Sequence, residues 1–154
     1  MENISNAVQR AVTDTLENLA FMEAFPVPED ISPGQALMTA ALLFHEPQQG
    51  EIRIAMPPAL LEKISHTVFG LPAEGTAVPE PKDLLAELLN TIAGRFLIEL
   101  LPADQPFRIG LPELDPPAAF ETDSCAICHF RADDHLFTIS VSNLFSIHPP
   151  RTGI

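Results

Sequence analysis

The sequence predicts an α/β fold of the α+β type, in which a duplicated αβ unit builds one mostly antiparallel sheet covered on one face by two long helices. Two observations lead to this expectation. The segments follow the order helix, strands, linker, helix, strands, and both long helical segments are amphipathic, so each needs an apolar surface to cover. Antiparallel hairpins joined into one sheet, with both helices on the same face, are the economical arrangement. A chain of 154 residues fits one domain, 1–154, that can bury a core.

The first half of the predicted repeat, residues 1–70, opens with apolar residues at helical spacing. This pattern predicts an amphipathic helix over residues 6–25, which Pro26 and Pro28 stop. The apolar stripe of this helix consists of Val8, Val12, Leu16, Leu19 and Met22.

Two strands and a shorter helix complete this half. Residues 35–45 and 51–56 read as strands, and the turn residues between them predict a hairpin. Pro57 and Pro58 begin the helix, because proline is tolerated in a first turn, where no amide donor is needed. The helix is expected to run to Phe69 and to stop at Gly70.

The second half, residues 82–146, follows a linker over 71–81 that is rich in Pro, Gly and Ala. A long helix is predicted to Leu101, closed by Pro102. Strand-like segments lie near 107–111, 125–131 and 136–141, with a tight turn at Asp133 and Asp134. The tail from Ile147 is expected to be loosely held.

The long helix of the second half carries an unusual outward face. Asp83, Glu87, Asn90 and Gly94 are spaced so that they fall within an arc of roughly 60°. Its buried stripe lies on the opposite side and consists of Leu85, Leu89, Ile92, Phe96 and Leu100. A carboxylate and a carboxamide therefore face outward together, and the glycine one turn later leaves room for a partner. An ordinary solvated helix face is the alternative interpretation of the same spacing.

This face resembles the signature helix of the CheC/CheX/FliY family of chemotaxis phosphatases. The resemblance rests on Asp83, Glu87 and Asn90, followed by Ala93-Gly94-Arg95 and by Pro112 after a strand-like stretch. It is strong over residues 82–113 and extends to the layout of most of the chain. It implies removal of the phosphoryl group from the aspartate of a phosphorylated CheY-like response regulator.

The resemblance also implies roles for the residues of this face. Asn90 suits the positioning of an in-line water, because its amide both donates and accepts hydrogen bonds and carries no charge. Glu87 would pair with a lysine of the response regulator, and Asp83 would be an outer contact at the helix start. The resemblance requires no cofactor and no metal from this chain, because the Mg²⁺ belongs to the partner.

The first helix offers a comparison with this face. Placing Thr13, Glu17, Ala20 and Ala24 against Asp83, Glu87, Asn90 and Gly94 aligns Glu17 with Glu87 but puts Ala20 where Asn90 stands. A methyl group cannot orient water, so Glu17 and Ala20 are interpreted as a degenerate second site; a plain surface glutamate is the other interpretation. The protein would then be closest to the single-site, CheX-like members, which form homodimers.

Composition limits the partners that the chain can bind. The formal charge of −13, with two lysines, Lys63 and Lys82, argues against nucleic acid and against anionic membrane surfaces. The N-terminus lacks the apolar core of a secretory signal, and no apolar run is long enough to span a bilayer, so we expect a cytoplasmic protein with no membrane insertion.

Cys125, Cys128 and His129 form the C-x-x-C-H string of c-type haem attachment. Haem attachment, a redox-active thiol pair and buried structural thiols are the three interpretations, and the absence of an export signal favours the last.

A non-catalytic adaptor that binds receiver domains or flagellar switch components is the alternative to a phosphatase. The five histidines show no metal-ligand spacing.

Overall fold

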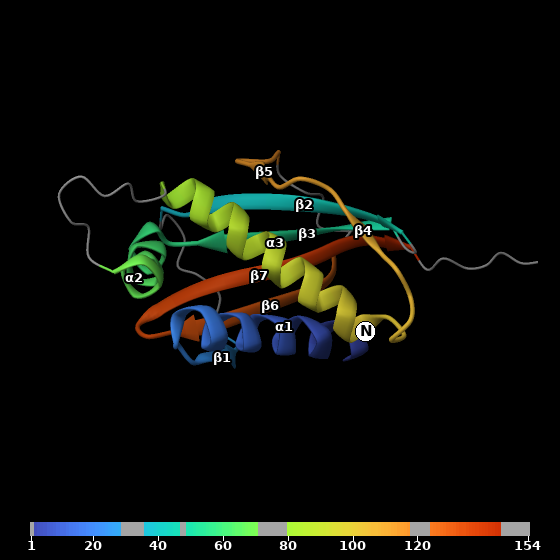
Figure 1. Cartoon of the computed structure of the whole chain (residues 1–154), viewed down its shortest axis with the longest axis horizontal. Helices are drawn as coiled ribbons and strands as arrows, with labels where there is room; N and C mark the ends of the chain where they lie inside the picture. Colours follow the sequence, from blue (N-terminus) through green and yellow to red (C-terminus); the bar gives the residue numbers. More distant parts are fainter. Residues whose placement is uncertain (1, 29–35, 47–48, 71–79, 118–123, 146–154) are drawn as a thin grey trace, which may run out of the picture.

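The computed structural model describes residues 2–28, 36–46, 49–70, 80–117 and 124–145. Three helices pack on one face of a seven-stranded sheet, shown in Figure 1. In chain order the elements are α1 (Glu2–Ala20), β1 (Ala24–Val27), β2 (Met38–Glu46), β3 (Gln49–Met56), α2 (Pro58–Phe69), α3 (Pro81–Leu100), β4 (Arg108–Ile109), β5 (Glu113–Leu114), β6 (Ser124–Ala132) and β7 (His135–Phe145). The predicted α+β class with a mostly antiparallel sheet is confirmed.

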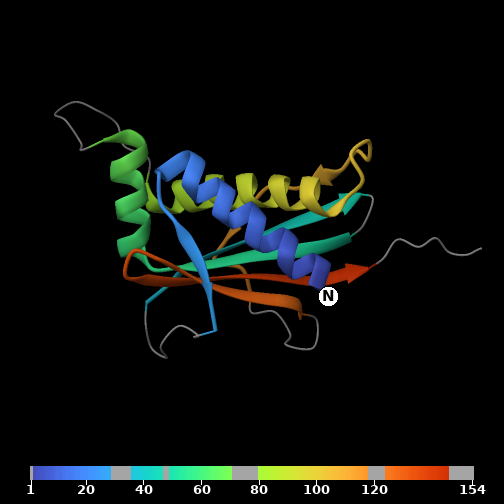
Figure 2. The ribbon, with the colours of Figure 1, turned by 90° about the horizontal axis from the view of Figure 1, so that it is seen from below.

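The sheet is antiparallel at every pairing and has the order β1-β6-β7-β3-β2-β4, with β5 also paired to β2. Exchanging β1 with β4, β2 with β6 and β3 with β7 maps this order onto itself. The exchange also swaps α1 with α3, which lie side by side over the same face (Figure 2). The division of the chain into repeat halves 1–70 and 82–146 stays a prediction. Helix α2 follows only the first half among the described elements.

Alternation is clearest along β3 and explains why the sheet places its apolar residues on one face. In β3, Ile52, Ile54 and Met56 are buried, whereas the residues between them are half-buried. Phe44 of β2 meets Phe96 of α3 with ring centroids 6.1 Å apart. The core therefore lies between the sheet and the helical layer.

The first helix differs from the prediction at both ends, and it begins at Glu2 instead of residue 6. Helix α1 ends at Ala20 instead of residue 25, because Phe21 adopts a left-handed conformation with φ 53° and the Met22 amide donates to the Leu16 carbonyl at 3.1 Å. Residues 24–27, including Pro26, then form an edge strand against β6. Met22 still packs against the core. The apolar pattern of the sequence therefore extends beyond Ala20, where the helix ends.

Within the segment predicted as a strand near 107–111, only Arg108–Ile109 forms a strand, β4, and a second short strand, β5, follows it; both pair with β2. Pro112 lies between them, and proline lacks the N–H that a continuous ladder needs. The hairpins β2–β3 and β6–β7 and the helix from Pro58 to Phe69 agree with the prediction, and Asp133 supplies a positive φ of 53° at the second turn. The linker over 71–79 and the tail from 147 lie outside the described residues.

None of the helices in the described ranges is long and apolar enough to cross a membrane.

Thr15 lies on the buried side of α1 with no exposed surface, and its hydroxyl has no hydrogen-bond partner among the described residues. We expect Thr15→Val to raise the free energy of unfolding by about 1 kcal/mol, because valine keeps the shape and removes an unpaired buried polar atom. Urea denaturation measures this change. Thr13→Val, half-buried on the same helix, is the control and should change little; a loss of stability in Thr15→Val would show that the hydroxyl has a partner.

Candidate functional site on helix α3

The sequence of α3 favours a helix start at Pro81 and the burial of one side of the helix. Pro81 occupies its first turn and Asp83 adds a carboxylate there, where the helix dipole favours negative charge. The buried residues recur in adjacent pairs at helical spacing: Leu84, Leu85, Leu88, Leu89, Ile92, Ala93, Phe96 and Leu97. These pairs hold one side of the helix against the core, so the other side must face outward.

The outward side carries the residues that the sequence singles out. Asp83, Glu87 and Asn90 are all exposed, and Gly94 is half-buried. We call these four residues the α3 arc. Among the described residues, the first three side chains make no hydrogen bond or ion pair. Two carboxylates and one carboxamide are therefore free to interact with a partner.

Gly94 has open space where a side chain would begin. A Cβ atom built at this position has no heavy atom within 4 Å. Tight packing against a neighbouring helix therefore does not explain the glycine.

The comparison of α1 with α3 needs correction. Ala20 is buried and Ala24 lies in β1, so neither shares an exposed helix face with Glu17. Leu19 belongs to the predicted apolar stripe but is 41% exposed, so that stripe does not follow the buried side of α1. The buried pairs of α1 are Ala7 and Val8, Ala11 and Val12, and Thr15 and Leu16.

Placing Ala7 and Val8 on Leu84 and Leu85 brings a different set of α1 residues onto the matching arc. The set consists of Asn6, Arg10, Thr13 and Glu17. No carboxylate on α1 stands three residues before a carboxamide, as Glu87 stands before Asn90. The arc of α1 therefore carries no second copy of the α3 pair.

The Cys125-x-x-Cys128-His129 string does not form a haem site in the described residues. Cys128 is buried in the core, whereas the next residue, His129, points to the opposite face of β6, where its Nδ1 lies 2.9 Å from Thr138 Oγ1. Burial raises the pKa of the Cys128 thiol, and a hydrogen bond with Ser5 opposes part of this rise. The thiol is therefore held protonated and unreactive, as expected of a structural cysteine. The Cys125 side chain lies outside the described residues.

Within the described ranges, no three His, Cys, Asp or Glu side chains lie close enough together to hold a metal ion. Asp83 and Glu87 share the α3 arc with the neutral amide of Asn90. This arrangement suits recognition of a positively charged side chain.

A family model of the chemotaxis phosphatase CheX matches residues 38–129, which include the whole of α3 and its arc. The chain belongs to the CheX family. The match leaves out α1, whose arc lacks the Glu-x-x-Asn pair. No curated protein matches the sequence.

Solved structures share the fold of this CheX-family chain at low sequence identity. A chemotaxis protein CheX from Desulfovibrio desulfuricans is 16% identical, with a TM-score of 0.73 over 92% of this chain and 99% of that chain. The CheX–CheY–BeF₃–Mg²⁺ complex from Borrelia burgdorferi matches with 15% identity and a TM-score of 0.61, covering 90% and 96% of the two chains. The FliM middle domain from Vibrio alginolyticus matches with 16% identity and a TM-score of 0.60, covering 95% and 94%.

Sequence reasoning missed three residues beside the arc. Leu19, Val68 and Phe69 are large, exposed apolar side chains that line one hollow together with Asp83 and Glu87. Phe69 departs from the buried side of α2, which consists of Leu60, Leu61 and Ile64, and this departure was the signal available in the sequence. Val68 lies one turn after Ile64 and continues the apolar spacing, so its exposure could not be read from the pattern.

The open space at Gly94 leads to a stability prediction. Gly94→Ala should raise the free energy of unfolding by about 1 kcal/mol, because alanine is the better helix former and its methyl group meets no neighbour. Chemical denaturation of the two proteins measures the difference. Gly110→Ala is the contrasting control, because its Cβ would stand 3.3 Å from the Leu43 carbonyl oxygen, so it should not stabilise the fold. A destabilised Gly94→Ala would contradict the exposed placement of the arc.

Proposed function

We propose that this CheX-family protein accelerates the hydrolysis of the phosphoaspartate of a CheY-like receiver domain. The observation that carries the proposal is the pair Glu87 and Asn90, exposed one turn apart on α3 and without partners in the described part of the chain. Membership of a family described as chemotaxis phosphatases supports it. The Borrelia burgdorferi match, a CheX bound to CheY with BeF₃ and Mg²⁺, supports a receiver domain as the partner.

The proposed hydrolysis forms no covalent bond between this chain and the phosphoryl group. A water oxygen attacks the phosphorus in line with the bond to the aspartyl oxygen; that bond breaks, its electron pair leaves with the carboxylate, and the water proton ends on inorganic phosphate. Asn90 would hold the water, because its carbonyl accepts a hydrogen bond from the water and its NH₂ can donate to a phosphoryl oxygen. The Mg²⁺ that offsets the phosphoryl charge would come with the receiver domain.

The other residues of the α3 arc would bind and orient the receiver domain. A carboxylate beside the phosphoryl group would repel it, so Glu87 suits a contact with a lysine of the partner. Asp83, one turn earlier, would add attraction at the edge of the same contact. Gly94 would let the partner backbone approach the helix closely.

The homodimer implied by the family resemblance is also part of this proposal. The described sheet ends in two short strands, β1 with four residues and β4 with two. An open sheet edge either needs protection or pairs with another chain, and the shortness of these two strands protects the edges, so the homodimer is proposed from the family resemblance.

Asn90→Ala tests the catalytic role directly. We expect the rate of receiver dephosphorylation at saturating phosphatase to fall about a hundredfold, because the water loses its position, while binding to the receiver changes little. Decay of acyl phosphate on a panel of CheY-like receivers from the same organism measures the rate. Asn6→Ala, an exposed asparagine on α1, is the matched control. Full activity in Asn90→Ala, or no acceleration of any receiver by the wild-type protein, would overturn the proposal.

A non-catalytic adaptor is the second candidate, and the match to the FliM middle domain favours it, because the same fold occurs in a domain whose name does not describe a phosphatase. Glu87→Lys separates the two functions. For a phosphatase, this substitution should lower both receiver affinity and turnover, since it places like charges together. Calorimetry and the acyl-phosphate assay measure the two effects. An adaptor would lose binding in Glu87→Lys yet show no dephosphorylation in any variant, and Asn90→Ala would leave it unchanged.

A further inference from the structure

A hollow of about 210 Å³ lies beside Glu87, where the C-terminal ends of α1 and α2 meet the first half of α3. We call it the α2–α3 hollow. Its lining consists of Leu19, Ile64, Val68, Phe69, Asp83, Leu84, Glu87, Leu88 and Thr91. Its size suits one aromatic or branched side chain.

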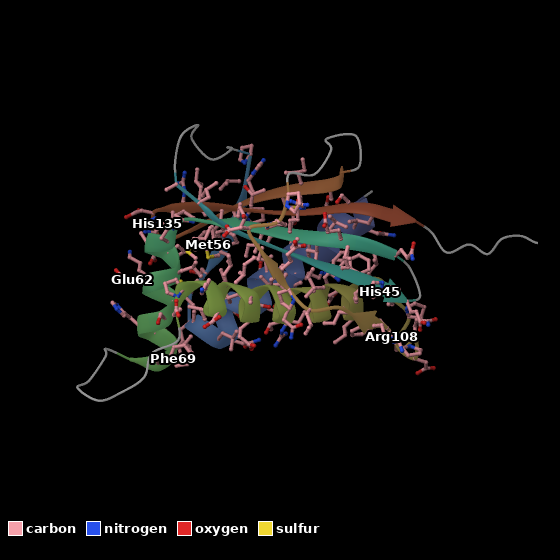
Figure 3. The ribbon with its side chains drawn as sticks, turned by 90° about the horizontal axis from the view of Figure 1, so that it is seen from above. His45, Met56, Glu62, Phe69, Arg108 and His135 are labelled. Atoms are coloured by element: carbon pink, nitrogen blue, oxygen red, sulfur yellow. The ribbon has the colours of Figure 1, made fainter. Side chains whose placement is uncertain are left out.

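The floor and the rim of the hollow are apolar. Ile64, Leu84 and Leu88 are buried and form the floor. Leu19, Val68 and Phe69 form the rim, with 41%, 36% and 48% of their surface exposed. Figure 3 shows Phe69 at the end of α2 that lies farther from the sheet. Three large apolar side chains around one depression are unusual on a solvated surface and are typical of a contact site.

The remaining edge of the hollow is acidic. Asp83 and Glu87 border it, and their carboxylates have no partner in the described residues. The Thr91 hydroxyl, also on this edge, donates to the Glu87 carbonyl at 3.0 Å and is thereby satisfied within the helix. A complementary ligand is therefore an apolar group with a positive charge next to it.

We propose that the α2–α3 hollow receives one apolar side chain of the receiver domain, at a position flanked by a lysine or arginine. The inference rests on the proposed function. Glu87 belongs both to the α3 arc and to the wall of the hollow, so a protein seated on Glu87 and Asn90 lies against the rim. The apolar contact would supply affinity, whereas the two carboxylates would select for the basic neighbour.

Truncation of the rim tests the proposal. Phe69→Ala should weaken binding of a BeF₃-loaded receiver about tenfold and raise KM by the same factor. It should leave kcat unchanged, because Glu87 and Asn90 are intact. Phe25→Ala is the matched control: Phe25 is 52% exposed on β1, away from α3, and its truncation should change neither quantity. Because both rings are half-exposed, thermal melting should show both variants folded.

Methyl spectroscopy provides a readout that does not depend on turnover. The methyl signals of Ile64, on the floor of the hollow, should shift when the loaded receiver binds, and those of Ile139, buried in β7, should not. Unchanged affinity in Phe69→Ala together with an unshifted Ile64 would overturn the proposal. Loss of self-association in Phe69→Ala, seen by light scattering with receiver affinity intact, would assign the hollow to a second copy of this chain and overturn it as well.

The catalytic proposal and the docking proposal can fail separately. If the wild-type protein binds the receiver through the hollow but does not accelerate dephosphorylation, the catalytic proposal fails and the docking surface stands. If turnover depends on Asn90 but not on Phe69, the docking surface fails alone. If no receiver binds, both fail.

Discussion

The contact between Phe96 of α3 and Phe44 of β2 is the constraint on which the α3 arc depends. The two rings pack with centroids 6.1 Å apart, and both side chains are fully buried. This contact, with the buried pairs on either side of it, fixes how far α3 is rotated about its own axis. A turn by one residue is about 100°, which would move Asn90 from the outward arc to the flank of the helix. The orientation of Glu87 and Asn90 is therefore a consequence of core packing and not of any contact that they make themselves.

That dependence explains why the arc could be predicted from the sequence. Leu85, Leu89 and Phe96 define the buried side of a regular helix, so the positions opposite them are exposed by geometry alone. The hairpins could be predicted for a similar reason, because alternation and turn residues are local signals.

Features that depend on distant contacts could not be predicted in the same way. Helix α1 ends at Ala20 because the following residues pair with β6, a strand about 100 positions later in the chain. Leu19 fits the apolar spacing of α1 but is 41% exposed at the rim of the α2–α3 hollow, whereas its neighbour Ala20 is buried in the core. The α2–α3 hollow needs residues from three helices, so no single segment of the sequence reveals it.

The strand order is symmetric, yet the two helical arcs differ in chemistry. Both helices bury paired apolar residues and expose the opposite side, so the fold by itself provides two places where a partner could be seated. On α1 that side carries Arg10, whose guanidinium lies 3.2 Å from Glu99 of α3. A cation at this place would repel the partner lysine that Glu87 is proposed to bind, and Thr13 lacks the amide that could both donate to a phosphoryl oxygen and accept from a water. The strand order alone would allow a site on either helix; the side chains on the outward side of α1 therefore decide against it.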